Sequence, residues 1–189
     1  MGKEKWLETG YRHFAMYGPN NFSINKISLE IESSRASFYH HFGESDIFLD
    51  ELLTMHWGII DTFIAAGKVE CKNLLPDLYN LLAKYPIPLQ FNLQLFHNRN
   101  KPDFNFIFIK SYAAIAKAFA LQLFADALDL NPSYPGVFDL WVTVGEAWYS
   151  RLDPNDLSAS TMQEHAREIL QTVTRLKNSK LYLSLNQIA

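Results

Sequence analysis

The chain has 189 residues, 48% of them hydrophobic and 14% aromatic, and a formal net charge of −3. This length suffices for one large domain, or for a small domain followed by a larger one. A single cysteine, Cys71, excludes an internal disulfide framework, and the first residues lack the apolar stretch of a signal peptide. We therefore expect a cytoplasmic protein whose charge does not by itself indicate a nucleic-acid partner.

The first fifty residues carry the signals of three short helices. Residues 3–18 place apolar side chains on one face. Ser23 is a suitable N-cap for a second helix, and Gly43 suits the end of a third helix over residues 35–42. A tight turn at residues 32–34 separates the second helix from the third. This arrangement predicts a helix-turn-helix.

The third predicted helix, within the segment SRASFYHHFGES, concentrates hydrogen-bonding side chains. Phe38 and Phe42 are one turn apart and are expected to hold one face in the core. Arg35 stands at the N-terminal end, where a recognition helix meets base edges and a guanidinium can bind guanine O6 and N7. The pattern predicts a short helix that presents polar groups to a polar partner.

The rest of the chain reads as a larger helical body. Residues 104–124 form its most apolar stretch, but Lys110 and Lys117 interrupt it, so we expect no membrane span. No glycine-rich phosphate loop, nucleophile elbow or His-x3-His pair is present, and the two adjacent histidines of the third helix cannot share a metal. We expect neither an enzyme nor a cofactor or metal site.

The last two long predicted helices each carry apolar residues at spacings of four and three. This spacing is typical of helices packed nearly side by side. Two interpretations remain open: an internal core, or a four-helix interface between two copies of the chain. The residues are Val137, Trp141, Val144 and Trp148 in the first helix, and Met162, Ala166, Ile169, Val173 and Leu176 in the second.

A family resemblance is carried by Phe14, Ala15, Gly18, Ser23, Ile27, Ser34, Ser37, Phe38, Tyr39, His41, Phe42, Leu49 and Leu52. With these residues, the segment 14–53 resembles the N-terminal DNA-binding domain of the TetR family of transcriptional regulators. The run S-F-Y-x-H-F at residues 37–42 is the most distinctive part.

The resemblance implies an all-α, TetR-like fold. A three-helix helix-turn-helix DNA-binding domain is expected over residues 1–46, and a helical ligand-binding and dimerisation domain over residues 47–189. It further implies a regulator that binds double-stranded operator DNA as a homodimer, under control of a small effector. The positions implied to face bases are Arg35, Ala36 and Tyr39, and those implied to contact the DNA backbone are Ser23, Ser37, His40 and His41.

Aromatic side chains of the body lie on segments that the family uses to enclose a ligand. They either fill an ordinary core or line an apolar cavity, which would favour an apolar or aromatic effector. The candidates for such a cavity are Phe91, Phe96, Phe104, Phe108 and Tyr112.

Two departures from the family pattern affect DNA binding. The turn carries Glu32 where a glycine is usual, which requires a left-handed or strained backbone there, and Ser45 replaces a usual phosphate-binding lysine. Residues 1–50 hold five Lys and Arg against seven Asp and Glu, a formal net charge of −2. Since phosphate neutralisation supplies much of DNA affinity, an alternative is a helical ligand-binding or interaction module that has lost most of that affinity.

Overall fold

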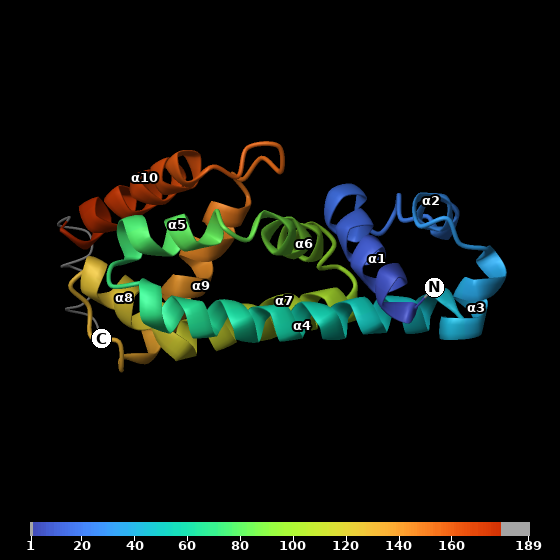
Figure 1. Ribbon diagram of the computed structural model, residues 1–189. Helices are drawn as coiled ribbons and strands as arrows, with labels where there is room; N and C mark the ends of the chain where they lie inside the picture. Colours follow the sequence, from blue (N-terminus) through green and yellow to red (C-terminus); the bar gives the residue numbers. More distant parts are fainter. Residues whose placement is uncertain (1, 179–189) are drawn as a thin grey trace. The chain divides into compact units, whose positions relative to one another are not determined.

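A computed structural model describes residues 2–178 of the chain. These residues form helices joined by turns, and within them the sole β feature is an isolated bridge between Asp153 and Asp156. The all-α prediction is confirmed. The helices labelled in Figure 1 are α1 (Lys3–Tyr17), α2 (Ile24–Glu30), α3 (Arg35–Phe42), α4 (Ser45–Glu70), α5 (Tyr79–Leu82), α6 (Pro86–His97), α7 (Pro102–Ile115), α8 (Leu121–Ala127), α9 (Pro135–Tyr149) and α10 (Ala159–Lys177). Two π-helical turns, η1 (Leu74–Leu78) and η2 (Ala116–Ala120), precede α5 and α8.

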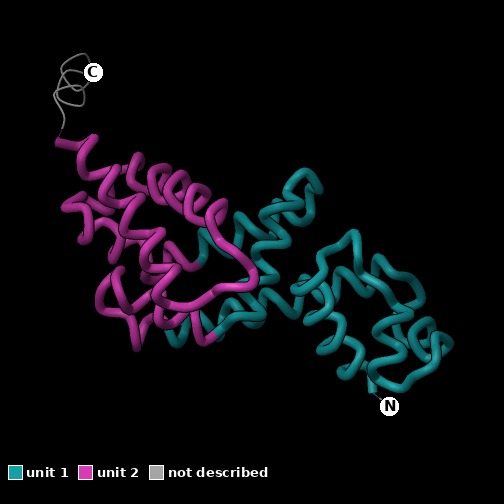
Figure 2. Tube along the Cα trace, turned by 90° about the horizontal axis from the view of Figure 1, so that it is seen from above, with its two compact units in different colours: residues 1–66, 85–114 teal, residues 67–84, 115–189 magenta. Residues whose placement is uncertain are grey.

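The chain divides into two compact units (Figure 2). Unit 1 comprises residues 1–66 and 85–114, and unit 2 comprises residues 67–84 and 115–189. Unit 1 therefore holds α1, α2, α3 and most of α4, together with α6 and nearly all of α7. This division by packing does not test a functional boundary after residue 46, which stays a prediction.

Phe38 is the centre of the small aromatic core that holds α3 in unit 1. Its ring centroid lies 5.2 Å from that of Trp6, 5.1 Å from that of Phe42 and 5.2 Å from that of Phe48. Trp6, Phe38 and Phe48 are fully buried, and Phe42 is nearly so. Full burial of a phenylalanine side chain contributes about 1.5–3 kcal/mol. The predicted anchoring of α3 by Phe38 and Phe42 is confirmed.

Side-chain caps set where the second and third helices begin. Oγ of Ser23 accepts a hydrogen bond from the Lys26 amide at 3.4 Å, and Oγ of Ser34 accepts one from the Ser37 amide at 3.2 Å. Each cap satisfies an amide that has no partner inside its own helix. The two serines thus set the N-termini of α2 and α3.

The core of unit 2 is built around the two long helices α9 and α10. The indole N–H of Trp148 donates to the Met162 carbonyl at 3.0 Å, and the rings of Trp148 and Tyr79 make an edge contact at 5.5 Å. The Trp141 ring meets that of Phe124 at 5.4 Å. Unit 2 itself therefore covers much of the apolar pattern of these helices. Its buried members are Val137, Trp141, Trp148, Met162, Ala166 and Ile169.

The other three members of that pattern face outward to different degrees. Val144 and Val173 are half-buried and Leu176 is exposed. Internal packing accounts for the six buried residues, so an interface on α9 and α10 has to use the outward side chains. The dimer interface stays a prediction, and it would have to involve Val144, Val173 and Leu176.

The stretch Pro102–Ala127 is long and apolar enough, by length and composition, to cross a membrane. Phe104, Phe108, Ala120 and Phe124 of this stretch are buried, but only 22% of its most apolar 18 residues are. Core helices meet the same criterion, and the two lysines inside the stretch are exposed.

Candidate nucleic-acid interface

The outer face of α3 carries the side chains that the sequence implied for DNA contact. Its first turn places Arg35 and Ala36 in solvent, and the next turn places Tyr39 and His40 there, with Tyr39 46% exposed. Ser37 and His41 are half-buried at the flanks, as is Ser23 at the start of α2. The structure thus leaves Arg35, Ala36, Tyr39 and His40 exposed around α3, while Phe38 and Phe42 point into the core.

The turn between α2 and α3 has the left-handed backbone that the sequence predicts. Glu32 has φ = 54°, and the Ser33 amide donates to the Ser28 carbonyl at 2.9 Å, five residues back, as in the 6→1 hydrogen bond of a Schellman motif. Glycine is the usual residue at this position because it has no Cβ to be crowded. Glu32 therefore holds a conformation that costs roughly 1–2 kcal/mol for a residue with a side chain.

Gly43 forms the equally tight turn between α3 and α4. It has φ = 70° and ψ = −59°, and the Glu44 amide donates to the Phe42 carbonyl at 2.7 Å across a three-residue turn. A Cβ is strained at this φ, so this connection needs glycine.

Carboxylates neutralise part of the positive charge of this region. Glu30 lies 2.5 Å from Nε2 of His13 and 2.5 Å from a guanidinium nitrogen of Arg12, and Lys3 pairs with Glu51 at 2.6 Å. The hydrogen bond from His13, assisted by the charge of Arg12, holds the pKa of Glu30 below its ordinary value.

The cluster of Arg12, His13 and Glu30 was not predicted from sequence, because its members come from different helices, α1 and α2. It fastens α2 to α1 and leaves Arg12 less able to bind a phosphate. Arg35 is exposed and makes no ion pair within residues 2–178.

The aromatic residues proposed to enclose a ligand fall into two clusters in unit 1. Phe91 and Phe104 both contact Phe14 of α1, with ring centroids at 4.4 and 5.6 Å. Phe108 contacts Phe96 at 5.5 Å and Tyr112 at 6.0 Å. The four phenylalanines are buried and Tyr112 is half-buried. A shared ligand cavity among them stays a prediction.

No group of His, Cys, Asp or Glu within residues 2–178 is arranged to hold a metal ion. Burial, with the nearby Asp77 and Glu70 adding to it, raises the pKa of the Cys71 thiol to about 11. A thiol with that pKa is almost wholly protonated at neutral pH and is a poor nucleophile.

Taken together, the described residues form an all-α fold in which a helix-turn-helix precedes a larger set of helices. A solved structure with a similar fold is that of Salmonella enterica GusR. The two structures match with a TM-score of 0.55 over 92% of this chain and 93% of that chain, at 15% sequence identity. At that identity the likeness concerns the fold. No protein-family model and no curated protein sequence matches the chain.

Proposed function

We propose that the protein is a cytoplasmic TetR-like transcriptional regulator that binds operator DNA as a homodimer through α3. One observation carries the proposal: α3 turns Phe38 and Phe42 into the core while Arg35, Ala36, Tyr39 and His40 are exposed. A helix held in this way can enter a major groove without losing its attachment to the domain.

The residues of this face divide by role. Arg35, near the N-terminus of α3, would read a guanine, with Ala36 and Tyr39 meeting neighbouring base edges. Ser23, Ser37, His40 and His41 would hold the DNA backbone and set the register of the helix. Two copies of α3 would occupy half-sites one helical turn apart, about 34 Å.

Control by a small effector completes the proposal. The effector would bind in the helical body and favour one spacing of the two α3 helices over another. A typical coupling between two such sites is about 1–3 kcal/mol. The ligand-binding candidates Phe108 and Tyr112 are tested by a thermal-shift screen of small apolar compounds, repeated on Phe108→Ala and Tyr112→Ala.

A second candidate is a module of the same fold that reads no DNA. The observation that favours it is charge: Lys3 and Arg12 are neutralised by carboxylates, and Glu32 places a further negative charge in the turn before α3. Such a protein would retain the helical body and its ligand, with little affinity for phosphates.

Selection of binding sites from random double-stranded DNA decides between the two candidates. If the protein is a DNA-binding regulator, the full chain should enrich a two-fold symmetric sequence. The Arg35→Ala variant should lose that sequence preference. Failure to enrich any sequence at low salt, with the protein folded by circular dichroism, favours the module instead.

A further inference from the structure

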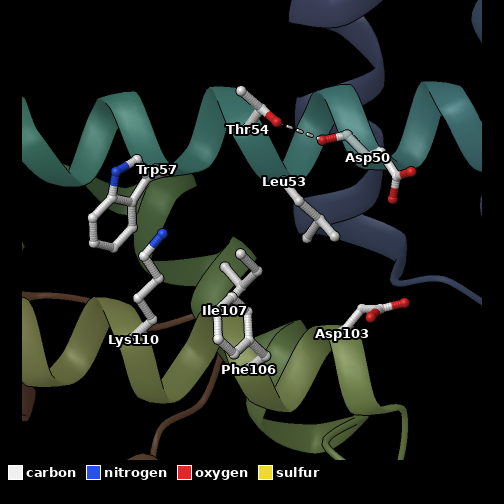
Figure 3. Close-up of a pocket in the computed structure, with 8 residues that line it drawn as sticks. All are labelled: Asp50, Leu53, Thr54, Trp57, Asp103, Phe106, Ile107 and Lys110. Atoms are coloured by element: carbon white, nitrogen blue, oxygen red, sulfur yellow. Dashed lines mark hydrogen bonds between the residues drawn. The ribbon is translucent and has the colours of Figure 1, made fainter.

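Helices α4 and α7 border a groove of about 410 Å³ within unit 1 (Figure 3). Each helix contributes positions i, i+3, i+4 and i+7, which start at Asp50 in α4 and at Asp103 in α7. These positions form one face of a helix. The volume is in the range of sites that hold small molecules.

One end of the groove is cationic and aromatic. Trp57 and Lys110 face each other there from the two helices (Figure 3), and Nζ of Lys110 lies 4.1 Å from the Trp57 ring centroid and 5.7 Å from that of Phe106. Within residues 2–178 Lys110 has no carboxylate partner. Its charge is therefore available to an anionic group.

The other end of the groove is anionic. Asp50 and Asp103 lie there on α4 and α7 (Figure 3), each seven residues before Trp57 and Lys110. Seven residues of helix rise about 10 Å, which is the distance between the two ends. Neither aspartate is ion-paired within the described part of the chain.

The middle of the groove is apolar. Leu53 is buried, Ile107 is half-buried and Phe106 is 62% exposed. Phe106 and Lys110 are exposed, whereas Phe104 and Phe108 of the same helix are buried in the core. The groove is thus distinct from the aromatic clusters of the interior, and it needs no rearrangement of them to receive a ligand.

We propose that this groove binds an elongated aromatic monocarboxylate that carries a hydrogen-bond donor at its far end. The carboxylate contacts Lys110, the ring lies against Leu53, Ile107 and Phe106, and the donor reaches the carboxylates of Asp50 and Asp103. A second anionic group on the ligand is repelled by the two aspartates, so dicarboxylates are excluded. The regulatory consequence rests on the proposed function, but the binding itself requires no DNA.

The test is isothermal titration calorimetry of the full chain with 3-(4-hydroxyphenyl)propanoate, which has about the required length. Two analogues test the two ends of this ligand one at a time. The corresponding primary amide lacks the negative charge, and 3-phenylpropanoate lacks the phenolic donor. Lys110→Met keeps the apolar stem of the side chain and removes the charge. Lys117→Met, at an exposed lysine of η2, is the matched control.

We expect millimolar or tighter binding of the propanoate, and about a tenfold or greater loss both in Lys110→Met and with the amide. In Lys110→Met the acid and the amide should bind equally, because the charge that distinguishes them is gone. Removal of the phenolic hydroxyl should weaken binding in the wild type and not in a variant with both Asp50→Ala and Asp103→Ala, which removes both acceptors. Lys117→Met should behave as the wild type.

Several outcomes would overturn the proposal. They are an absence of binding at millimolar propanoate, equal affinity for the acid and the amide in the wild type, or unchanged affinity in Lys110→Met. The amide comparison leaves the protein unaltered, so it holds even if Lys110→Met folds poorly. If the propanoate binds as expected while DNA selection enriches nothing, the groove stands and the regulatory function fails.

Discussion

The hydroxyl oxygen of Tyr11 lies 2.7 Å from Nδ1 of His56 in the core of unit 1. Nε2 of His56 lies 3.2 Å from Oδ1 of Asn92, and an amide oxygen can only accept, so Nε2 carries the proton and Nδ1 accepts from Tyr11. The rings of Tyr11 and His56 both stack on Phe91, at 4.4 and 4.5 Å. One buried polar chain therefore joins α1, α4 and α6, and it requires a neutral imidazole.

The first prediction concerns the pH dependence of stability. His56 is fully buried, and this burial lowers its pKa from 6.5 to about 4. The unfolded chain binds the proton more tightly than the folded chain, so the stabilisation is complete above pH 6.5 and is lost as pH falls toward 4. The loss is about 3 kcal/mol in the free energy of unfolding, measured by urea denaturation across this range.

The control for this prediction is His56→Gln, which removes the titrating group. The variant should be less stable at neutral pH by about 1–3 kcal/mol, because Tyr11 loses a good acceptor. Its stability should also fall less steeply between pH 6.5 and 4. If the free energy of unfolding falls equally steeply with pH in the variant and in the wild type, groups other than His56 cause the acid sensitivity.

The second prediction is that Arg35 discriminates between bases. A bidentate guanine contact is worth about 1–3 kcal/mol, so Arg35→Ala should flatten the preference at one position of each half-site. The measurement is a set of affinities for single-base variants of the selected operator. Arg167→Ala, at an exposed arginine of α10, is the control. Equal weakening on all sequences would show that Arg35 contacts phosphate only.

The third prediction concerns the left-handed turn at Glu32. Glu32→Gly should relieve backbone strain and raise the free energy of unfolding by up to about 1 kcal/mol, a gain limited by the greater freedom of glycine in the unfolded chain. It should also strengthen DNA binding, because it removes a negative charge. Glu32→Gln separates the effects: it should improve DNA binding at low salt and leave stability nearly unchanged. A less stable Glu32→Gly protein would contradict the strain argument.

The fourth prediction concerns dimerisation through the outward side of α9 and α10. Val144 is half-buried in the single chain, so Val144→Glu should produce folded monomers, measured by light scattering after gel filtration and by thermal melting. Ile169 is buried, and Ile169→Glu should instead unfold unit 2. Gln122→Glu, at an exposed position of α8, should leave the oligomer intact. A wild-type monomer at micromolar concentration would refute the proposed interface.

The local features of the helix-turn-helix were predictable from sequence because short-range chemistry decides them. Ser23 and Ser34 cap their helices with hydrogen bonds to amides three residues on, and Phe38 and Phe42 share a face through helical spacing. The positive φ of Glu32 followed from its place in a turn that normally takes glycine. Each of these relationships spans four residues or fewer.

Only the tertiary structure decided which side chains of other helices each helix contacts. Spacing in α9 and α10 could not distinguish a core from an interface, since both need the same apolar periodicity; burial of Trp141 and Met162 within unit 2 assigns them to the core. The contacts of Tyr11 with His56 and of Trp57 with Lys110 join residues about fifty apart, and such pairings depend on how whole helices pack. Sequence determined the helices and their exposed chemistry, whereas packing determined which polar groups are buried and which remain open to a ligand.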